Sequence, residues 1–237
     1  MTEPIIIKSL GDTALIIYFG DEISAELNAR VHTVAHHLSM PPLPGLIEMV
    51  PAYTTLTKHY DPLVIEASQP EQTLRQIILS RLEQCPKARS KQGRTIDIPV
   101  CYDAEFGPDL SIVANHNQIT TDEVICCHSS GVYQVYFLGF SPGFPFMGGM
   151  SVDIATPRRD SPRFVIPAGS VGIAGAQTGI YPMETPGGWQ LIGRTPIPLV
   201  DFDRDHPTLL QPGDNIKFQP ISSSEYQAIY ASKKVSV

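Results

Sequence analysis

The sequence predicts an α+β protein in which a small sandwich of sheet and helices precedes a β-barrel or β-sandwich. Three observations carry this prediction. Residues 1–90 contain the order strand, strand, helix twice over, residues 85–94 are polar and lack periodicity, and short strands broken by glycine and proline follow residue 131. The chain has 237 residues, which is enough to bury a core in each of two small domains.

Two strands and a helix open the predicted sandwich, and the same three elements then repeat. IIIKSL and TALIIYF flank the hairpin turn signal Gly11-Asp12, and the proline-rich MPPLPG precedes a second strand pair, LIEMV and TTLTKHY. Ser68 and Glu71 have capping-box spacing at the start of the second helix. Helices on one side of an antiparallel sheet are therefore expected. The apolar face of the first helix comprises Ile23, Leu27, Val31, Val34 and Leu38.

The second domain is expected to begin after a linker, CPKARSKQGR, at residues 85–94. The strand TIDIPVCY follows, and then two helices, DLSIVANHNQ and TTDEVICCHSS, of which the second has Thr120 and Glu123 at capping-box spacing. Later runs such as VYQVYFLGF, RFVIPA, SVGIAG and NIKFQP alternate with turn residues, which is typical of a barrel or sandwich. The predicted domains are residues 1–90 and 91–237.

The charge and the cysteine pattern exclude several classes of protein. A formal net charge of −7 and a pI of 5.4 oppose broad binding to nucleic acid or to an anionic membrane surface. The N-terminus lacks a basic region followed by an apolar core, and no apolar run reaches membrane-spanning length, so a cytoplasmic location is expected. In that compartment Cys85, Cys101, Cys126 and Cys127 are expected to be reduced, buried thiols.

Two motifs that suggest other functions do not meet their requirements. His32 and His36 are four residues apart in a predicted helix, but Thr33 stands where the zinc-protease motif needs glutamate. The helical pair of the second domain has the rhythm of a helix-turn-helix, but its second helix offers Asp122 and Glu123 in place of basic residues. We therefore predict no metal site and no reading of DNA.

Aromatic residues between glycines and prolines indicate an apolar wall. In FLGFSPGFPFMGGM, at residues 137–150, rigid turns hold Phe140 and Phe144. A core loop whose rings only pack against one another is the alternative, and the sequence leaves both interpretations open.

The segment TPRRDSPRFVIPAGS presents arginines on a stiff backbone. Arg158 and Arg163 each follow a proline directly, and Arg159 comes between them. A guanidinium group can bind a carboxylate or a phosphate at two points, and rigid presentation is what a binding site needs. The arginines therefore favour a small anionic guest at the mouth of the barrel.

The loops that follow add neutral polar groups. GAQTGIYP supplies Gln177, Thr178 and Tyr181 between glycines that let backbone approach a ligand, and PGGWQLIGRTP adds Arg194. His128 is expected to be either a proton carrier near neutral pH or a structural histidine. The phosphate-loop motif GxxxxGK[ST] does not occur in the sequence, so a partner or a different device must house any nucleotide chemistry.

Long motifs in the second domain resemble one family. EFGPDL, FLGFSPGFPFMGG and PRRDSPRFVIPAGSVGIAGAQTGIYPMETPGGWQLIGRTP resemble the B subunit of the bacterial ATP-dependent 5-oxoprolinase, a family also called KipI and allophanate hydrolase subunit 1. The resemblance covers nearly the whole chain and implies a ferredoxin-like α/β sandwich followed by a cyclophilin-like β-barrel. It also implies work with the A subunit and with the C subunit, a KipA-like protein of cyclophilin fold, to open 5-oxo-L-proline to L-glutamate while ATP is hydrolysed.

The implied reaction suggests roles for the candidate residues. A lactam resists water because resonance stabilises its amide, and phosphorylation of the amide oxygen would turn that oxygen into a leaving group. ATP is expected as a co-substrate bound with or by the partner proteins, and no metal is expected in this chain. The residues expected to be catalytic are His128, Arg163 and Gln177. Those expected to bind substrate are Phe140, Phe144, Arg158, Thr178, Tyr181 and Arg194.

Two interpretations from other classes stay open. A KipI-type member inhibits a sensor histidine kinase by contact, so capture of a kinase would favour that function, whereas a neighbouring gene for the C subunit would favour the enzyme. A prolyl isomerase is suggested only by the barrel, and a peptide isomerisation assay would test it. Phe146-Met147 stands where the family has Tyr-Leu, and Thr185 stands where serine is usual, which affects the shape of the pocket rather than the class.

Overall fold

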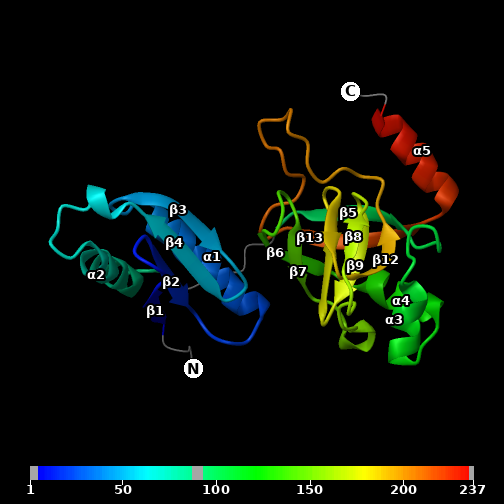
Figure 1. Ribbon diagram of the computed structural model, residues 1–237, viewed down its shortest axis with the longest axis horizontal. Coiled ribbons are helices and arrows are strands. Elements are labelled where there is room, and N and C mark those ends of the chain that lie inside the picture. Colours follow the sequence, from blue (N-terminus) through cyan, green and yellow to red (C-terminus); the bar gives the residue numbers. More distant parts are fainter. Residues whose placement is uncertain (1–4, 87–92, 235–237) are drawn as a thin grey trace. The chain divides into compact units, whose positions relative to one another are not determined.

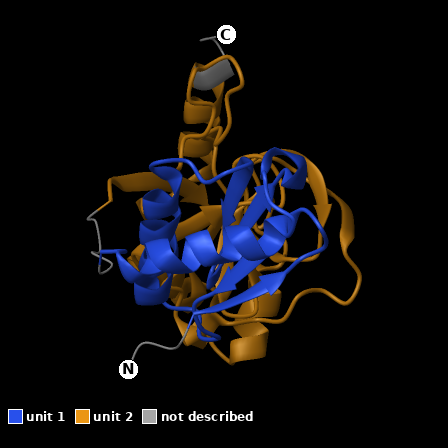
Figure 2. Ribbon diagram, turned by 90° about the vertical axis from the view of Figure 1, so that its left-hand side faces the viewer, with its two compact units in different colours: residues 1–91 blue, residues 92–237 orange. Residues whose placement is uncertain are grey.

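The computed structural model describes residues 5–86 and 93–234 and divides the chain into two compact units, residues 1–91 and 92–237 (Figure 2). The predicted linker spans this division, and residues 87–92 of it lie outside the described residues. Each unit has a core of its own, because the buried apolar side chains of the two units form separate clusters.

The first unit is a four-stranded antiparallel sheet with two helices (Figure 1), and the strands lie in the order β1-β2-β4-β3. The predicted order of strand, strand and helix, made twice, is confirmed. This order becomes that of a ferredoxin-like unit when the first strand is counted last, so the ferredoxin-like description stays a prediction. The elements are β1 Ile6–Ser9, β2 Ala14–Tyr18, α1 Ala25–Ser39, β3 Leu46–Pro51, β4 Thr55–Tyr60, the 3₁₀ turn η1 Pro62–Val64 and α2 Pro70–Glu83.

The core of this unit joins one face of the sheet to both helices. Alternate residues of β2 and β4 point into it, which matches the period of two for strands. Lys58 takes one of these inward positions and is 0% exposed, so a cationic side chain lies among apolar ones. Burial of each apolar side chain in this core contributes about 1.5–3 kcal/mol to stability. The fully buried apolar residues of the core include Leu15, Ile17, Val31, Leu38, Leu56, Leu74 and Ile78.

The start of α2 differs from the prediction. The helix begins after Gln69 with a proline in its first turn and no side-chain cap bond. The Glu71 carboxylate accepts hydrogen bonds from Ser9 at 2.6 Å and from Arg75 at 2.7 Å. The predicted capping box of Ser68 and Glu71 is therefore wrong, because an ion pair along the helix and a contact with β1 occupy the glutamate.

The second unit is built around a closed barrel of seven strands in the order β10-β7-β6-β13-β5-β12-β9 (Figure 1). Of the barrel and the sandwich that the sequence allowed, the structure has the barrel. Strands β8 and β11 form a separate two-stranded sheet. The elements are β5 Thr95–Cys101, α3 Leu110–Asn117, α4 Thr121–Ser130, β6 Tyr133–Leu138, β7 Pro145–Gly148, the 3₁₀ turn η2 Val152–Ile154, β8 Arg163–Ile166, β9 Ser170–Ala174, β10 Gln177–Ile180, β11 Thr185–Gly187, β12 Gln190–Arg194, β13 Asn215–Ile221 and α5 Ser223–Lys234.

Two contacts close the barrel and cover it. Strand β13 pairs in parallel with β5, from Asn215 opposite Thr95 to Ile221 opposite Cys101. Helices α3 and α4 contribute Val113 and Val124, both 0% exposed, to the same core as the barrel strands. The first and last strands of the unit are thus neighbours, and the helical pair that resembled a DNA-binding motif is part of the hydrophobic core.

Helix α4 begins as the sequence predicts. The Thr120 backbone N–H donates to Glu123 Oε2 at 2.7 Å, and the Glu123 N–H donates to Thr120 Oγ1 at 3.2 Å. These reciprocal bonds are a capping box, which satisfies two backbone donors at the helix start. They hold the pKa of the Glu123 carboxyl below its ordinary value.

The sequence predicts no membrane-spanning helix, no metal site and four buried thiols. No helix within residues 5–86 and 93–234 has the length and apolar character needed to cross a bilayer. In the same ranges no three His, Cys, Asp or Glu side chains gather as the ligands of a metal ion would. All four cysteines are free. Cys101 is buried, but Cys85 and Cys127 are half-buried and Cys126 is exposed, so the prediction of buried thiols holds for Cys101 alone.

Candidate functional site

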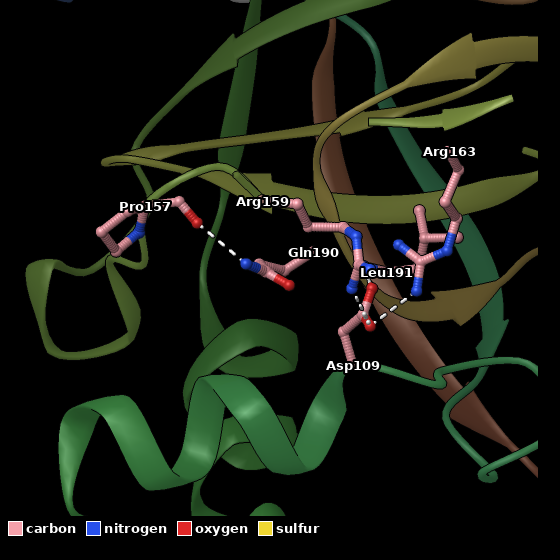
Figure 3. Close-up of polar contacts among 6 residues, drawn as sticks. All are labelled: Asp109, Pro157, Arg159, Arg163, Gln190 and Leu191. Carbon is pink, nitrogen blue, oxygen red and sulfur yellow. Dashed lines mark hydrogen bonds and ion pairs between the residues drawn. The ribbon is translucent and has the colours of Figure 1, made fainter. Parts of the chain in front are cut away.

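Two arginines of the proline-rich segment meet the carboxylate of Asp109 (Figure 3). Arg163 Nη2 donates to Asp109 Oδ1 at 2.7 Å, and Arg159 Nη1 donates to the same oxygen at 3.2 Å. Asp109 Oδ2 accepts the backbone N–H of Leu191 at 2.7 Å. The Asp109 side chain is 2% exposed, whereas those of Arg159 and Arg163 are 31% and 23% exposed. A buried carboxylate therefore holds two guanidinium groups that reach the surface.

The backbone brings these residues together from distant parts of the sequence. Asp109 precedes α3, and its N–H donates to the carbonyl of Leu191 in β12 at 2.9 Å. The Arg159 N–H donates to the carbonyl of Gly188 at 2.8 Å, and Arg163 pairs with Gly187 across β8 and β11. The start of α3, the two-stranded sheet and a barrel strand therefore converge on one carboxylate.

Glycine is required where the segment before α3 approaches β12. A Cβ atom on Gly107 would lie 2.2 Å from the carbonyl oxygen of Ile192, which is far inside van der Waals contact. Any side chain there would push the two segments apart and separate Asp109 from Leu191. The EFGPDL motif thus carries both the close approach and the carboxylate that depends on it.

Gln190 completes the group beside the arginines (Figure 3). It is 6% exposed, and its Nε2 donates to the carbonyl of Pro157 at 3.0 Å. Gln190 Oε1, Arg159 Nε and Arg163 Nη1 are all closed off from solvent and have no hydrogen-bond partner. Each such atom costs about 1–3 kcal/mol when it stays unpaired. We refer to Asp109, Arg159, Arg163 and Gln190 as the Asp109 cluster.

The Asp109 cluster has a formal surplus of positive charge. Arginine is always protonated in proteins, so Arg159 and Arg163 bring two positive charges against the one carboxylate of Asp109. Donor atoms without partners and a net charge of one are properties of a site that binds an anion. The cluster can therefore hold a carboxylate or a phosphate oxygen.

A group of buried aromatic and aliphatic side chains adjoins the Asp109 cluster. The ring of Phe144 lies 5.3 Å from that of Tyr181 and 5.5 Å from that of Trp189, in edge-to-face arrangements. Leu191, whose N–H binds Asp109, packs in this group. We refer to it as the aromatic cluster; it comprises Phe144, Ile166, Ala174, Tyr181, Trp189 and Leu191.

Tyr181 connects the aromatic cluster with the arginines. Burial raises the pKa of Tyr181 to about 12, against the opposing effect of a hydrogen bond with Trp189 and of the charges of Arg158 and Arg163. Gly187 leaves room for its hydroxyl, because a Cβ there would lie 2.6 Å from Tyr181 Oη. The phenol is therefore neutral at physiological pH and lies within the field of both arginines.

The structure groups the predicted arginines differently from the expectation. Arg163 belongs to the Asp109 cluster, but its partner there is Arg159, whereas the predicted partner Arg158 is exposed. Arg194 lies elsewhere on β12, with its guanidinium carbon 5.6 Å from the ring centroid of Phe106. Of the three arginines predicted as site residues, the structure brings only Arg163 to the carboxylate.

The two predicted phenylalanines differ in exposure. Phe144 is 2% exposed in the aromatic cluster, whereas Phe140 is 66% exposed, with its ring 5.5 Å from that of Phe144 and 6.5 Å from that of Tyr181. Phe140 has a φ of 65°, a left-handed conformation that is unusual for a bulky residue. Phe140 therefore projects outward from a wall that its neighbours form.

His128 and Thr178 lie inside the barrel and bind each other. Thr178 Oγ1 donates to the carbonyl of Gly172 at 3.1 Å, so it accepts from His128 Nε2 at 3.0 Å. His128 Nδ1 then accepts the Tyr102 hydroxyl at 2.7 Å. Burial lowers the pKa of His128 to about 3, so the ring is neutral. This geometry favours the structural interpretation of His128, and the role of proton carrier stays a prediction.

Gln177 stands next to this network in the chain. It is half-buried at the start of β10, where it pairs with Ala174 of β9. Sequence reasoning gave no site role to Asp109 or Gln190, and it placed Arg159 among the arginines of the stiff segment without giving it a role of its own. Each stands in a motif quoted above, but nothing local marks Asp109 as the partner of arginines 50 and 54 positions away.

Comparisons with known proteins agree on the class. Residues 5–210 match the family described as "Carboxyltransferase domain, subdomain C and D". The chain is 49% identical over 234 residues to the 5-oxoprolinase B subunit of Bacillus subtilis (strain 168), which covers 96% of this chain and 98% of that protein. The fold and the match over most of the chain define a carboxyltransferase subdomain C and D protein. Within that class, the chain belongs to the family of 5-oxoprolinase B subunits.

Solved structures with the same fold include longer chains. The crystal structure of TTHA0988 matches with a TM-score of 0.74 and 35% identity, over 92% of this chain and 41% of that chain. The urea amidolyase of K. lactis matches with a TM-score of 0.79 over 96% of this chain and 15% of that chain, and its 20% identity shows the fold alone. In both proteins a counterpart of this chain is joined to further polypeptide.

Proposed function

We propose that the chain is the B subunit of an ATP-dependent 5-oxoprolinase that opens 5-oxo-L-proline to L-glutamate in the cytoplasm, together with the A and C subunits. The observation that carries this proposal is the Asp109 cluster, with its surplus positive charge and unpaired donors, in a chain whose relative of 49% identity is named as a 5-oxoprolinase B subunit. The substrate is a small ring with one carboxylate, which suits an arginine pair next to aromatic side chains.

The residues of the chain would divide the work by their positions. Arg163 and Arg159 would bind the substrate carboxylate, while Phe144 and Tyr181 would form the wall against which the ring lies. Arg158 is exposed, and its positive charge opposes the rise in the pKa of Tyr181. This charge would add to the attraction for an anion. Binding of this kind holds the lactam in one orientation, which lowers the entropic part of the barrier.

The network inside the barrel would support the site indirectly. His128 and Thr178 fix β10 through their hydrogen bonds, and Gln177 is the next residue of that strand. In this proposal Gln177 orients the lactam, and Thr178 and His128 position Gln177. Phe140 would cover the ring from the outside, because it is exposed and lies near Phe144.

ATP is proposed as a co-substrate bound with or by the partner proteins. A formal charge of +1 at the Asp109 cluster suits one carboxylate better than the several negative charges of a triphosphate. The chain also has no GxxxxGK[ST] loop. ATP supplies the activation of the lactam carbonyl, and this chain would hold and orient the substrate for it.

A need for partners is supported by the longer relatives. TTHA0988 carries a counterpart of this chain as 41% of its length, so related sequences occur joined to other polypeptide. We propose that the C subunit, a KipA-like protein of cyclophilin fold, and the A subunit supply the remaining parts of the enzyme.

Reassembly of the enzyme tests the proposal. The purified chain is mixed with the A and C subunits, and glutamate formed from 5-oxoproline with ATP is measured. The expected result is turnover that is lost when this chain is left out and restored when it is added back. Equal turnover with and without the chain would show that it has another function.

A further inference from the structure

We propose that Asp109 sets the net charge of the Asp109 cluster and thereby selects a ligand with one negative charge over a ligand with two. The inference rests on the proposed function, because it assigns the substrate carboxylate to the same two arginines. It adds a residue that determines specificity and a chemical class of guest, a monoanionic carboxylate that also offers an N–H group.

The Asp109 carboxylate is fixed by contacts at both of its oxygens. Both guanidinium groups donate to a single oxygen, Asp109 Oδ1, while Oδ2 is tied to the Leu191 N–H at 2.7 Å. The backbone of Asp109 is tied to the same residue through its own N–H. The carboxylate therefore cannot turn away, and it holds two like charges side by side that would otherwise repel each other.

The Asp109 side chain does not cap the helix that it precedes. Asp109 occupies the N-cap position of α3, where aspartate usually accepts a backbone N–H of the first turn. Its carboxylate makes no cap bond, because the arginines and Leu191 use it. A cap is worth about 1 kcal/mol, so the helix gives up this stabilisation for the contact with the arginines.

Three buried polar atoms of the Asp109 cluster have no hydrogen-bond partner. Arg159 Nε and Arg163 Nη1 are donors, and Gln190 Oε1 is an acceptor in a side chain that is 6% exposed. A guest with anionic oxygens and an N–H group offers a partner to both kinds of atom. These atoms are closed off from solvent, so a guest reaches them when the partly exposed arginine side chains shift.

The charge balance predicts the preference. With Asp109 ionised, the formal charge is +1, and a monoanion neutralises it, whereas a dianion leaves a buried negative charge in excess. Replacement of the carboxylate by an amide raises the formal charge to +2, which favours a dianion. The change should alter the ratio of two affinities, and a purely structural role of Asp109 would not do so.

The experiment measures binding to the full-length chain by calorimetry at about pH 8, where inorganic phosphate is mostly a dianion. The probes are L-5-oxoproline, 2-pyrrolidinone, which lacks the carboxylate, cyclopentanecarboxylate, which lacks the lactam, and inorganic phosphate. The wild-type chain should prefer 5-oxoproline to phosphate and to both analogues. In Asp109→Asn the ratio of phosphate affinity to 5-oxoproline affinity should rise at least about tenfold.

Matched variants control the measurement. Asp201 also pairs with an arginine, at 2.7 Å, but it is 40% exposed, so Asp201→Asn should leave the affinity ratio unchanged. Asp109→Glu keeps the charge and should keep the preference for the monoanion while both affinities fall. If Asp109→Asn fails to fold by circular dichroism, Arg159→Gln decides, because it lowers the formal charge to zero at a side chain that is 31% exposed.

Each outcome decides the inference. An unchanged ratio in Asp109→Asn overturns it, as does a wild-type chain that binds neither anion or an Arg159→Gln variant that binds 5-oxoproline as well as wild type. An altered ratio in a chain that the reassembled enzyme does not need leaves the inference standing and the proposed function wrong. An unchanged ratio in a chain that the enzyme does need overturns the inference and leaves the proposed function standing.

Discussion

The second unit holds two clusters of buried polar side chains that differ in hydrogen bonding and in charge. In the barrel, Tyr102, His128 and Thr178 form a chain of hydrogen bonds that ends on the carbonyl of Gly172. Beside the two-stranded sheet, the Asp109 cluster leaves three polar atoms unpaired and carries a surplus charge. A closed network stabilises a fold, whereas an open one with a charge is equipped for a ligand.

Lowering the pH is the strongest test of the closed network of Tyr102, His128 and Thr178. Burial lowers the pKa of His128 to about 3 from an ordinary value of 6.5, so between these values the unfolded chain binds a proton that the folded chain does not. Stability should therefore fall as the pH falls from 6.5 toward 3, by at most about 5 kcal/mol. Urea unfolding of the second unit, followed by its single tryptophan, Trp189, measures this at several pH values.

The controls for the acid test are two histidine variants. His128→Gln removes the group that titrates, so its stability should depend less steeply on pH than that of wild type. His206→Gln changes an exposed residue and should keep the wild-type slope. Equal slopes for wild type and His128→Gln would mean that the buried ring does not behave as a neutral structural group.

The next test concerns the open cluster. Arg163→Ala should lower kcat/KM for 5-oxoproline about 100-fold in the reassembled enzyme, since a hydrogen bond to a charged group contributes about 1.5–3 kcal/mol. Arg204→Ala, which removes an arginine that is 71% exposed in its pair with Asp201, should leave kcat/KM unchanged. If Arg163→Ala left both affinity and turnover intact, the open cluster would not be the site of the anion.

A substitution of Thr178 separates the two groups more finely. Thr178→Val leaves His128 Nε2–H and the Gly172 carbonyl without their partner, so the free energy of unfolding should drop by about 1–3 kcal/mol. Affinity for 5-oxoproline should change less than stability, because the hydroxyl is used within the barrel. Thr33→Val removes a hydroxyl that donates to the Ala29 carbonyl at 2.8 Å within α1 of the first unit, and it serves as the control. A large loss of affinity with intact stability would instead place Thr178 in contact with substrate.

The smallest expected effect tests whether a buried polar atom without a hydrogen-bond partner always indicates a ligand-binding site. Lys58 in the first unit is 0% exposed, and its Nζ has no partner. Burial, with a smaller effect of Arg81, lowers its pKa to about 8 from 10.5. Lys58→Met should therefore stabilise the first unit by about 1–2 kcal/mol at neutral pH. Amide hydrogen exchange in β4 measures it.

Lys58 also predicts a pH dependence of stability, but in the alkaline range rather than the acidic range of His128. Between pH 8 and 10.5 the unfolded chain keeps a proton on Lys58 that the folded chain has lost, so the stability of the first unit should rise with pH in this window. Lys8→Met, at a lysine of β1 beside the Tyr18 ring, should not alter that rise. A Lys58→Met variant less stable than wild type would mean that the amine has a partner, and the distinction between closed and open groups would need revision.

The sequence was sufficient for what depends on local pattern. Helical spacing predicted α1, except that Ile23 precedes the helix and is 49% exposed. The Thr120 and Glu123 pair predicted the start of α4, because caps and amphipathic faces are set within a few residues. Ser68 and Glu71 show the limit, since the same spacing failed where Arg75 and Ser9 competed for the glutamate. A local pattern cannot reveal a competitor that folding brings in.

The site depended more on contacts across the fold. Stiff arginines near aromatic residues could be read from TPRRDSPRF, and Arg163 is part of the cluster. The choice of Arg159 over Arg158 depends on the Gly188 carbonyl that fixes its backbone, and Asp109 lies 50 positions from its nearer arginine partner. His128 looked available for proton transfer because a sequence does not show that a residue is enclosed by a barrel.

The parallel pairing of β5 with β13 has a consequence for synthesis. The ribosome releases β5 as the first strand of the second unit, yet its partner β13, from Asn215 to Ile221, is the last strand to emerge. For more than a hundred residues of translation one edge of β5 has nothing to bind, and such late, long-range pairing slows folding and favours misassembly. Helices α3 and α4 emerge soon after β5, but the strands against which they pack, β12 and β13, are also made late.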